Sequence, residues 1–169
     1  DEECAQFRQV LDEQKQGFVE PFLTAPSPGI IAAAIPNEHY DTFEAYVDAL
    51  TEALKVEWEA IVNAGFLLQL DCPDLALSRH LIFTGLSDVD FVRVAQSHVE
   101  ALNHALEGVP EEQVRIHICW GNYEGPHVCD IDMARVFDPL MKAKARYVLF
   151  ETANPRHGHE WAVIEDRKF

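Results

Sequence analysis

The sequence has no long apolar run, and its first residues include no basic segment followed by an apolar one. No hydrophobic stretch approaches the ~20 residues that a membrane-spanning helix needs. A secretory leader also needs a basic segment before its apolar core, and the opening Asp-Glu-Glu-Cys has none. We therefore expect no membrane partner, and a cytoplasmic location is the default.

Basic side chains are scarce. The chain has 13 Lys and Arg residues against 29 Asp and Glu residues, for a formal net charge of −16. A negative field of this size repels nucleic acid and anionic membranes, and no local cluster of basic residues offsets it. We expect no nucleic-acid partner, and the acidity indicates a soluble protein.

Paired cysteine motifs are also missing. The four cysteines are scattered without CxxC spacing, at Cys4, Cys72, Cys119 and Cys129. Thiols stay reduced in the cytosol, so metal binding or simple burial is expected before a disulfide. With 169 residues, 48% of them hydrophobic and 25% charged, the composition is that of one globular domain.

Hydrophobic periodicity predicts helices and buried strands in alternation. The helices are expected near residues 1–16, 43–63, 89–106 and 131–145, and the strands near 18–24, 66–70, 114–119 and 147–151. Residues 25–29 are a proline and glycine cluster that we expect to be irregular, followed by a loop over residues 29–36. Long connections are expected over 71–88, 120–130 and 152–159, and a helical or irregular end over 161–169. The almost continuous apolar run at 66–70 predicts a strand buried on both faces.

This alternation predicts an α/β fold with a parallel sheet and crossover helices. A doubly wound sheet and a (β/α)₈ TIM barrel both fit the pattern. A dinucleotide-binding doubly wound sheet has a glycine-rich turn after its first strand, and no GxGxxG occurs here. Three successive strands instead end in polar groups: Asp71, the pair His117 and Cys119, and Glu151. Active groups of a barrel lie at such strand ends, so the sequence favours the barrel type, with about four βα units in this chain.

The motif His117-x-Cys119 is the first candidate site. Alternate side chains of a strand share a face, so this imidazole and thiol point the same way and provide half of a zinc site. A core histidine and a buried thiol are the alternative. Glu151 strengthens the metal interpretation because a carboxylate in a buried run requires a cation, although it could also cap a helix or pair with Arg156.

Three segments together carry a family resemblance: residues 68–76 (LQLDCPDLA), 115–127 (RIHICWGNYEGPH) and 150–161 (FETANPRHGHEW). They resemble cobalamin-independent methionine synthase, and more closely the shorter single-barrel proteins related to its C-terminal half. The resemblance implies a (β/α)₈ barrel that transfers a methyl or other alkyl group to a thiol such as homocysteine, from a folate-type or other donor. It implies zinc as cofactor, with His117, Cys119 and Glu151 as metal ligands, and Asp71 as the carboxylate that holds the amino group of homocysteine.

The sequence departs from this family in extent. About four of eight strands are present, and the family's second, distal cysteine would lie beyond Phe169. We expect residues 1–169 to be a partial TIM-barrel catalytic domain, truncated at both ends. The fourth zinc ligand would then be Cys129, His127 or water, and the chain would self-associate through its open sheet edges.

Further residues form a histidine-rich rim around the expected site: His127, Arg156, His157 and His159. They either bind an anionic group of the substrate or tie the loops together. Trp120, Tyr123 and Trp161 are expected to pack, with stacking on a flat methyl donor as the alternative.

Two other functions remain open. The chain could be an inactive or incomplete barrel fragment that acts only with a missing half. It could also be a related zinc-dependent thiol alkyltransferase of the coenzyme M type. Metal-assisted hydrolysis predicts His-x-His at the first motif instead of His-x-Cys, so we rank it below these.

Overall fold

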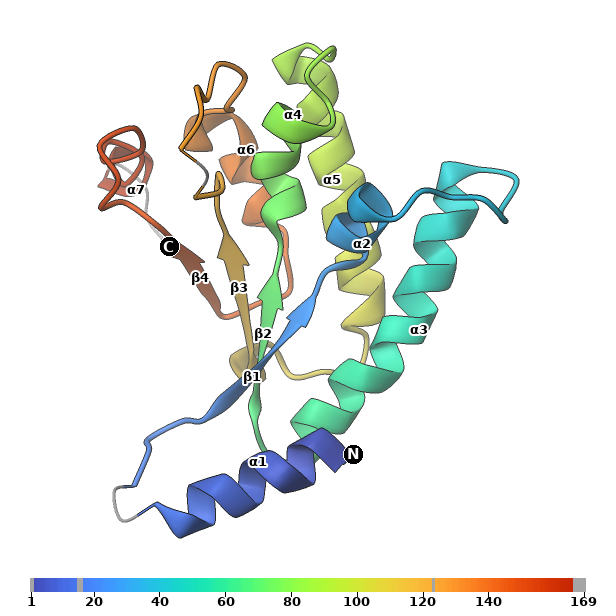
Figure 1. The fold of residues 1–169 in the computed structure, drawn as a ribbon, viewed down its shortest axis with the longest axis vertical. Coiled ribbons are helices and arrows are strands. Elements are labelled where there is room, and N and C mark those ends of the chain that lie inside the picture. The colour runs from blue at the N-terminus through green and yellow to red at the C-terminus, as the bar shows by residue number, and fades with distance from the viewer. Residues whose placement is uncertain (1, 15–16, 123, 166–169) are drawn as a thin grey trace.

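A computed structural model describes residues 2–14, 17–122 and 124–165, and these form an α/β fold around one parallel sheet (Figure 1). The described strands are β1 (Phe22–Pro26), β2 (Leu67–Asp71), β3 (Val114–Ile118) and β4 (Tyr147–Phe150). All neighbours pair in parallel, in the spatial order β1-β2-β3-β4, which is also their order along the chain. The predicted α/β class with a parallel sheet is confirmed.

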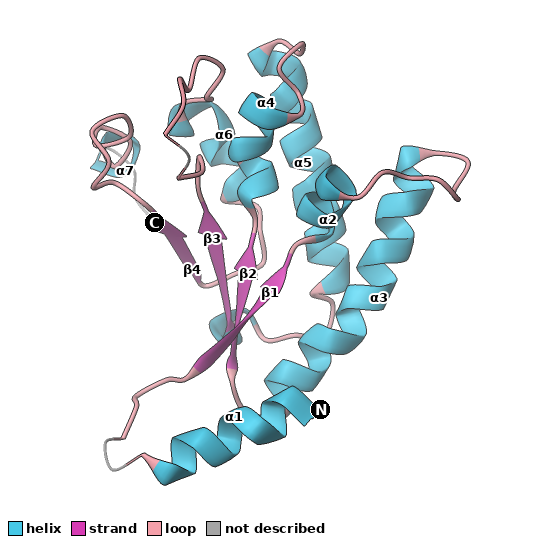
Figure 2. Cartoon of the chain, in the orientation of Figure 1, coloured by secondary structure: helices cyan, strands magenta, loops and turns pink. Residues whose placement is uncertain are grey.

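Helices accompany the strands, and the long helices that connect successive strands lie behind the sheet in the view of Figures 1 and 2, whereas the N-terminal helix lies below it. The helices are α1 (Glu2–Glu13), α2 (Pro28–Ala34), α3 (Phe43–Asn63), α4 (Leu77–Leu81), α5 (Asp88–Ala105), α6 (Met133–Leu140) and α7 (Ala162–Glu165). Single 3₁₀ turns occupy Pro73–Leu75 and Glu111–Gln113. The two longest helices begin at hydroxyl caps: Thr42 accepts the Ala45 N–H, and Ser87 accepts the Asp90 N–H.

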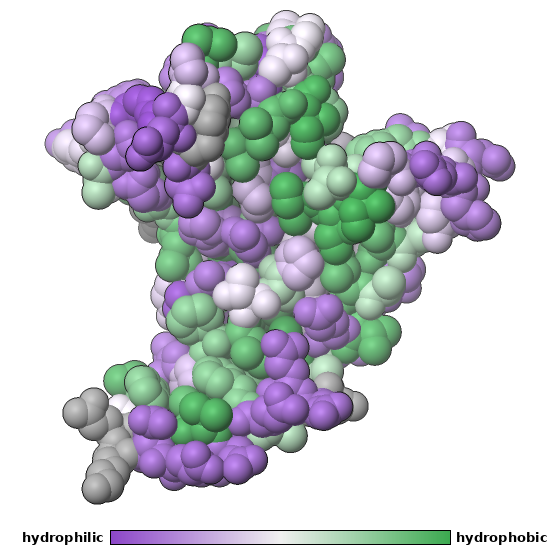
Figure 3. All heavy atoms as spheres, viewed as in Figure 1, coloured by the Kyte–Doolittle hydropathy of each residue, from purple (hydrophilic) through white to green (hydrophobic). Residues whose placement is uncertain are grey.

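The two faces of the sheet differ in burial. On the helix-covered face, Leu68, Leu70 and Ile116 have no exposed surface. On the opposite face, Gln69 and Arg115 are only half-buried, and the Arg115 Nε donates a hydrogen bond to Gln69 Oε1 at 2.8 Å. The prediction that residues 66–70 are buried on both faces is wrong, because the described helices cover only one face. Figure 3 shows hydrophobic and hydrophilic residues mixed on the side that faces the viewer in Figure 1.

The hydrophobic core fills the space between the sheet and α3, α5 and α6. Its largest fully buried side chains include Trp58 of α3, Phe66 before β2 and Phe91 of α5. Full burial of one such side chain stabilises a fold by roughly 1.5–3 kcal/mol. The core therefore holds the helices against the strands and fixes where the strand ends lie.

The proline-rich segment 25–29 is more regular than its composition predicts. Pro26 is the last residue of the edge strand β1, where a missing N–H costs no ladder hydrogen bond. Ser27 caps α2 by accepting the Ile30 N–H at 3.1 Å, and Pro28 takes the first helical position, where proline is favourable. The expected irregular segment and loop at 25–36 are thus wrong. The first strand also begins later than expected, at Phe22.

Other elements differ in detail from those expected. The expected connection 71–88 contains α4 and a 3₁₀ turn. The helix α6 is shorter than the expected 131–145, with Pro139 in its last turn. α1 lies within the expected helix 1–16, of which residues 1, 15 and 16 fall outside the described part. α7 lies within 161–169, of which residues 166–169 also fall outside it. Among the described helices, none is long and apolar enough to cross a membrane.

Candidate functional site

The carboxyl ends of β2, β3 and β4 border a cavity of about 410 Å³. Its walls include the four residues singled out from the sequence, Asp71, His117, Cys119 and Glu151, together with Trp120 and His157. These four residues come from segments far apart in the chain. Parallel pairing brings them together, because neighbouring parallel strands end at the same edge of a sheet.

Asp71 and His117 are direct partners across the β2–β3 ladder. The Asp71 Oδ1 lies 2.5 Å from the Nδ1 of His117, and both side chains remain partly exposed. A carboxylate beside Nδ1 holds the proton on that nitrogen, which leaves Nε2 as the lone-pair atom. Asp71 therefore fixes the tautomer and the orientation of the His117 ring.

Cys119 follows β3 directly, and its carbonyl accepts the Leu77 N–H at 3.1 Å. Gly121 then turns the chain with φ of +82°, a conformation that favours glycine. A Cβ at Gly121 would lie 2.7 Å from the Leu77 Cδ1, so a side chain here would strain the backbone and force the Leu77 side chain to shift. The sharp turn keeps the Cys119 thiol at the cavity wall.

Burial raises the pKa of the Cys119 thiol above its ordinary value. A hydrogen bond from the Gly121 backbone acts in the opposite direction, and the negative charge of Asp71 raises the pKa further. The raised pKa favours the protonated form of the Cys119 thiol. A bound cation is needed to convert it into the thiolate that ligates metals.

Glu151 follows β4, and it is exposed. Its Oε1 accepts the Asn154 N–H at 2.5 Å, so the carboxylate caps the turn after the strand. The argument that a buried carboxylate here requires a cation is wrong, because β4 is the edge strand and is only partly buried. Glu151 reaches the cavity as a turn-capping group.

The structure brings His117, Cys119 and Glu151 to one cavity without gathering their ligand atoms. They do not form one of the groups of described residues whose ligand atoms all lie within 4.8 Å of one another. Imidazole, thiol and carboxylate are nevertheless the donor types that zinc takes in proteins, and the thiol favours zinc over magnesium or calcium. The donor chemistry fits zinc. Cys129 and His127, the expected sources of a fourth ligand, are not among the residues that line this cavity.

Of the expected rim residues, only His157 lines the cavity. Its ring stacks on the Trp120 indole, with centroids 4.3 Å apart. The Oδ2 of Asp130 lies 2.8 Å from the His127 Nδ1 and 2.9 Å from the His157 Nε2. The contact between His157 and Asp130 therefore ties two loops together, which was one of the two alternatives for the rim, whereas His127 and Asp130 belong to the same loop.

The other two rim residues are at the surface. The His159 side chain is 66% exposed, and the Arg156 Nη1 donates to the Gly125 carbonyl at 3.4 Å. The partners of these histidines, Asp130 and the buried Glu160, were not expected from the sequence. The signal for them was spacing, since each carboxylate follows a histidine by three residues, as in His127 and Asp130.

The aromatic residues near the site have different roles. Trp120 is buried and donates its indole N–H to the Ile131 carbonyl at 2.6 Å, so its packing role is confirmed. Trp161 is 50% exposed, which contradicts a packing role. Tyr123 lies outside the described residues.

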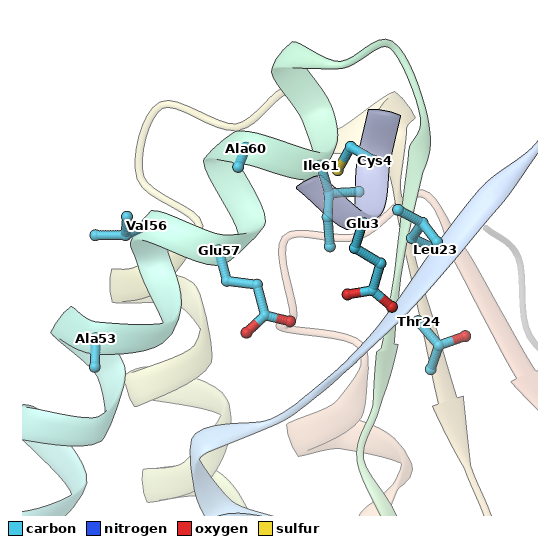
Figure 4. Close-up of a pocket in the computed structure, with 9 residues that line it drawn as sticks. All are labelled: Glu3, Cys4, Leu23, Thr24, Ala53, Val56, Glu57, Ala60 and Ile61. Carbon is cyan, nitrogen blue, oxygen red and sulfur yellow. The ribbon is translucent and has the colours of Figure 1, made fainter. Parts of the chain in front are cut away.

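A second cavity, of about 350 Å³, lies between α1, α3 and β1 (Figure 4). Figure 4 shows the side chains of Glu3 and Glu57 pointing into it from the two helices. It has no histidine, and its carboxylates belong to no cluster of three metal-ligand residues within the described ranges. The cavity at the strand ends combines more reactive side chains and is the stronger functional candidate.

No match to this chain is found among models of known protein families, among curated proteins or among solved structures.

Proposed function

We propose that the cavity at the ends of β2, β3 and β4 is the site of zinc-dependent alkyl transfer to a thiol. The observation that carries this proposal is that Asp71, His117, Cys119 and Glu151 line one cavity. These are the residues to which the resemblance to cobalamin-independent methionine synthase assigns substrate and zinc binding. We propose the same family, with homocysteine or a related thiol as acceptor and a folate-type or other methyl donor.

We also propose that the fold is part of a (β/α)₈ barrel. The strand order follows the chain without reversal, and the crossover helices lie on one face. A doubly wound sheet reverses its strand order and carries helices on both faces. A barrel keeps sequential order and puts its helices outside, so the uncovered face with Gln69 and Arg115 corresponds to a barrel interior.

The chain's own residues have distinct tasks in this chemistry. His117 presents Nε2 because Asp71 holds its Nδ1 proton, and Cys119 supplies a thiol that gives up its proton on cation binding. When bound, zinc lowers the pKa of a substrate thiol and so provides a thiolate at neutral pH. The substrate sulfur then forms a bond to the methyl carbon as the bond between methyl and donor breaks, and the donor leaves with the electron pair. Trp120 and His157 wall the cavity and orient the reactants.

A second hypothesis is that this chain acts only together with further strands. The observation in its favour is the uncovered, partly polar face of the sheet. Under this hypothesis the zinc site lacks a ligand and the chain alone has little activity. A coenzyme M type of thiol alkyl transfer uses the same residues and differs only in its substrates.

The proposal is tested with Cys119→Ser, which replaces a soft ligand with a poor one at almost constant volume. We expect the serine variant to lose zinc bound through a thiolate and at least about 100-fold of the thiol-alkylation rate. Cys129→Ser is the matched control, because Cys129 is a half-buried thiol further along the same loop and does not line the cavity. Homocysteine and a sulfonated thiol are assayed in parallel, with the 169-residue chain and with any longer form of the protein.

Three outcomes are informative. Loss of activity and of the thiolate-bound zinc in Cys119→Ser, but not in Cys129→Ser, supports the alkyl-transfer site. Normal zinc content or normal turnover in that variant would show that Cys119 is not a zinc ligand of the proposed site. Activity only in a longer form supports the hypothesis of an incomplete domain.

A further inference from the structure

A cluster of largely buried polar side chains lies beside the cavity, and it contains none of the proposed zinc ligands. His127 and Asp130 belong to the loop between β3 and α6, and His157 belongs to the loop between β4 and α7. Their imidazole and carboxylate atoms all lie within 4.8 Å of one another. Both imidazoles approach the same oxygen, Asp130 Oδ2, at 2.8 and 2.9 Å.

This cluster is well shielded from solvent. The side chains of His127, Asp130 and His157 are 2%, 12% and 9% exposed. The second carboxylate oxygen, Asp130 Oδ1, is buried without a hydrogen-bond partner among the described residues, and the His80 Nδ1 lies 3.9 Å from it. A buried carboxylate that is only partly satisfied by hydrogen bonds is stabilised by a cation.

A second carboxylate orients one of the histidines. The Oε1 of Glu160, itself 4% exposed, lies 3.3 Å from the His157 Nδ1, and its Oε2 accepts the Met133 N–H at 2.9 Å. This carboxylate favours a proton on the His157 Nδ1, while the Nε2 of the same ring faces Asp130. Metal-binding histidines are positioned in this way by carboxylates behind them.

The hydrogen-bonding capacity of His157 argues in the same direction. A neutral imidazole has one donor and one acceptor nitrogen, yet both ring nitrogens of His157 face carboxylates. Either the ring is an imidazolium that donates twice, or a cation lies between Nε2 and Asp130. Two imidazoles and a carboxylate with shared burial are a donor set that suits a divalent transition metal, and two nitrogen ligands disfavour magnesium and calcium.

We propose that His127, Asp130 and His157 bind a second divalent transition-metal ion, with zinc preferred, in a site separate from Cys119. The ion holds the loop after β3 against the loop after β4. Since the His157 ring stacks on Trp120 and lines the cavity, the same ion shapes one wall of that cavity. This proposal does not rest on the alkyl-transfer function.

The test separates the two sites by spectroscopy. Metal-free chain is titrated with Co²⁺, which gives a thiolate-to-cobalt charge-transfer band only when a cysteine is a ligand, and bound metal is counted per chain. In Cys119→Ser we expect the thiolate band to disappear and one equivalent of Co²⁺ or Zn²⁺ to remain. Adding Asp130→Asn or His127→Gln to that variant should remove the remaining equivalent and abolish the rise in Tm that Zn²⁺ produces.

Two further variants sharpen the result. Glu160→Gln should weaken the remaining equivalent by about 10–100-fold, because it removes the charge of the carboxylate that orients His157 and keeps an amide oxygen that can still accept the Met133 N–H. His39→Gln is the control, since His39 is an exposed histidine in another loop and should leave both metal equivalents unchanged.

The proposal is overturned if Cys119→Ser binds no metal, or if its bound metal survives both Asp130→Asn and His127→Gln. Circular dichroism of each variant shows whether it is folded, and using two substitutions keeps the test valid if one of them unfolds the chain. If the unaltered chain shows no thiolate band and binds one equivalent that Asp130→Asn removes, this site stands and the result counts against the proposed function alone.

Discussion

Asp71 Oδ1 lies 2.5 Å from the Nδ1 of His117, its direct partner in the β2–β3 ladder. The resemblance assigns this carboxylate to the amino group of a substrate, whereas the geometry gives it a second task. It positions the histidine that is proposed as a zinc ligand. The two tasks predict different consequences of one substitution.

Asp71→Asn should weaken Co²⁺ or Zn²⁺ binding at the Cys119 site by about 10–100-fold, since the amide no longer accepts the His117 proton as strongly. The alkylation rate should be compared for homocysteine and for a thiol without an amino group. Equal losses for both thiols indicate a positioning role, and a larger loss for homocysteine indicates direct contact with its amino group. Unchanged metal affinity would contradict the positioning role.

Metal binding at Cys119 should strengthen as the pH rises. Burial raises the pKa of this thiol, so near neutral pH a proton must be displaced when the thiolate binds a cation. Below the thiol pKa the apparent affinity should increase by about tenfold per pH unit for this proton. Metal affinity should therefore be measured between pH 6 and 8. The slope of log affinity against pH should be greater by one, for one released proton, in the unaltered chain than in Cys119→Ser. Equal slopes would show that Cys119 does not ligate the metal.

Gly121→Ala should destabilise the chain by about 1–3 kcal/mol, because a side chain at φ +82° is strained and its Cβ would meet Leu77. Gly65→Ala is a matched control with the same φ, since the nearest atom to its Cβ is 3.6 Å away, at the end of the Arg8 side chain. Urea unfolding should show that Gly121→Ala lowers the free energy of unfolding more than Gly65→Ala does. Combining Gly121→Ala with Leu77→Ala should recover the part of the loss due to contact.

The chain should associate through its sheet. β1 and β4 are edge strands, and the face with Thr24, Gln69 and Arg115 has no covering helix among the described elements. Sedimentation velocity should show assemblies that grow with concentration. Thr24→Lys, which places a charge on the open face, should weaken this association at least about tenfold. Val89→Lys, on the exposed side of α5, should leave it unchanged. A monomer at all concentrations would contradict this prediction.

The elements of the sheet were predictable from the sequence because buried strands and amphipathic helices have distinct periods. α3 matches the predicted helix at 43–63, since Thr42 caps its start and Trp58 lies on its apolar face. The short helix α2 was missed because prolines usually interrupt regular structure, and only the capping bond from Ser27 shows that Pro28 begins a helix. The apolar run at β2 gave no sign of the uncovered face, since the composition of a strand does not report which helices cover it.

The site was predictable in its location and less so in its contacts. The ends of parallel strands gather whatever residues follow them, so Asp71, His117, Cys119 and Glu151 could be placed together from strand order alone. The pairing of Asp71 with His117 depends on the register between β2 and β3, which the sequence does not specify. The loop contacts of Asp130 depend on how two separate loops fold against each other, which periodicity does not describe.

His157 belongs both to the cavity wall and to the cluster around Asp130, so a single ring would be shared by the two proposed binding equilibria. A cation that fixes this ring changes the free energy of any ligand that contacts it from the cavity. Thermodynamic linkage requires the effect to be mutual, and a substrate that tightens cation binding by some factor has its own binding tightened by the same factor. The supply of metal ion would then set how strongly the cavity retains its substrate.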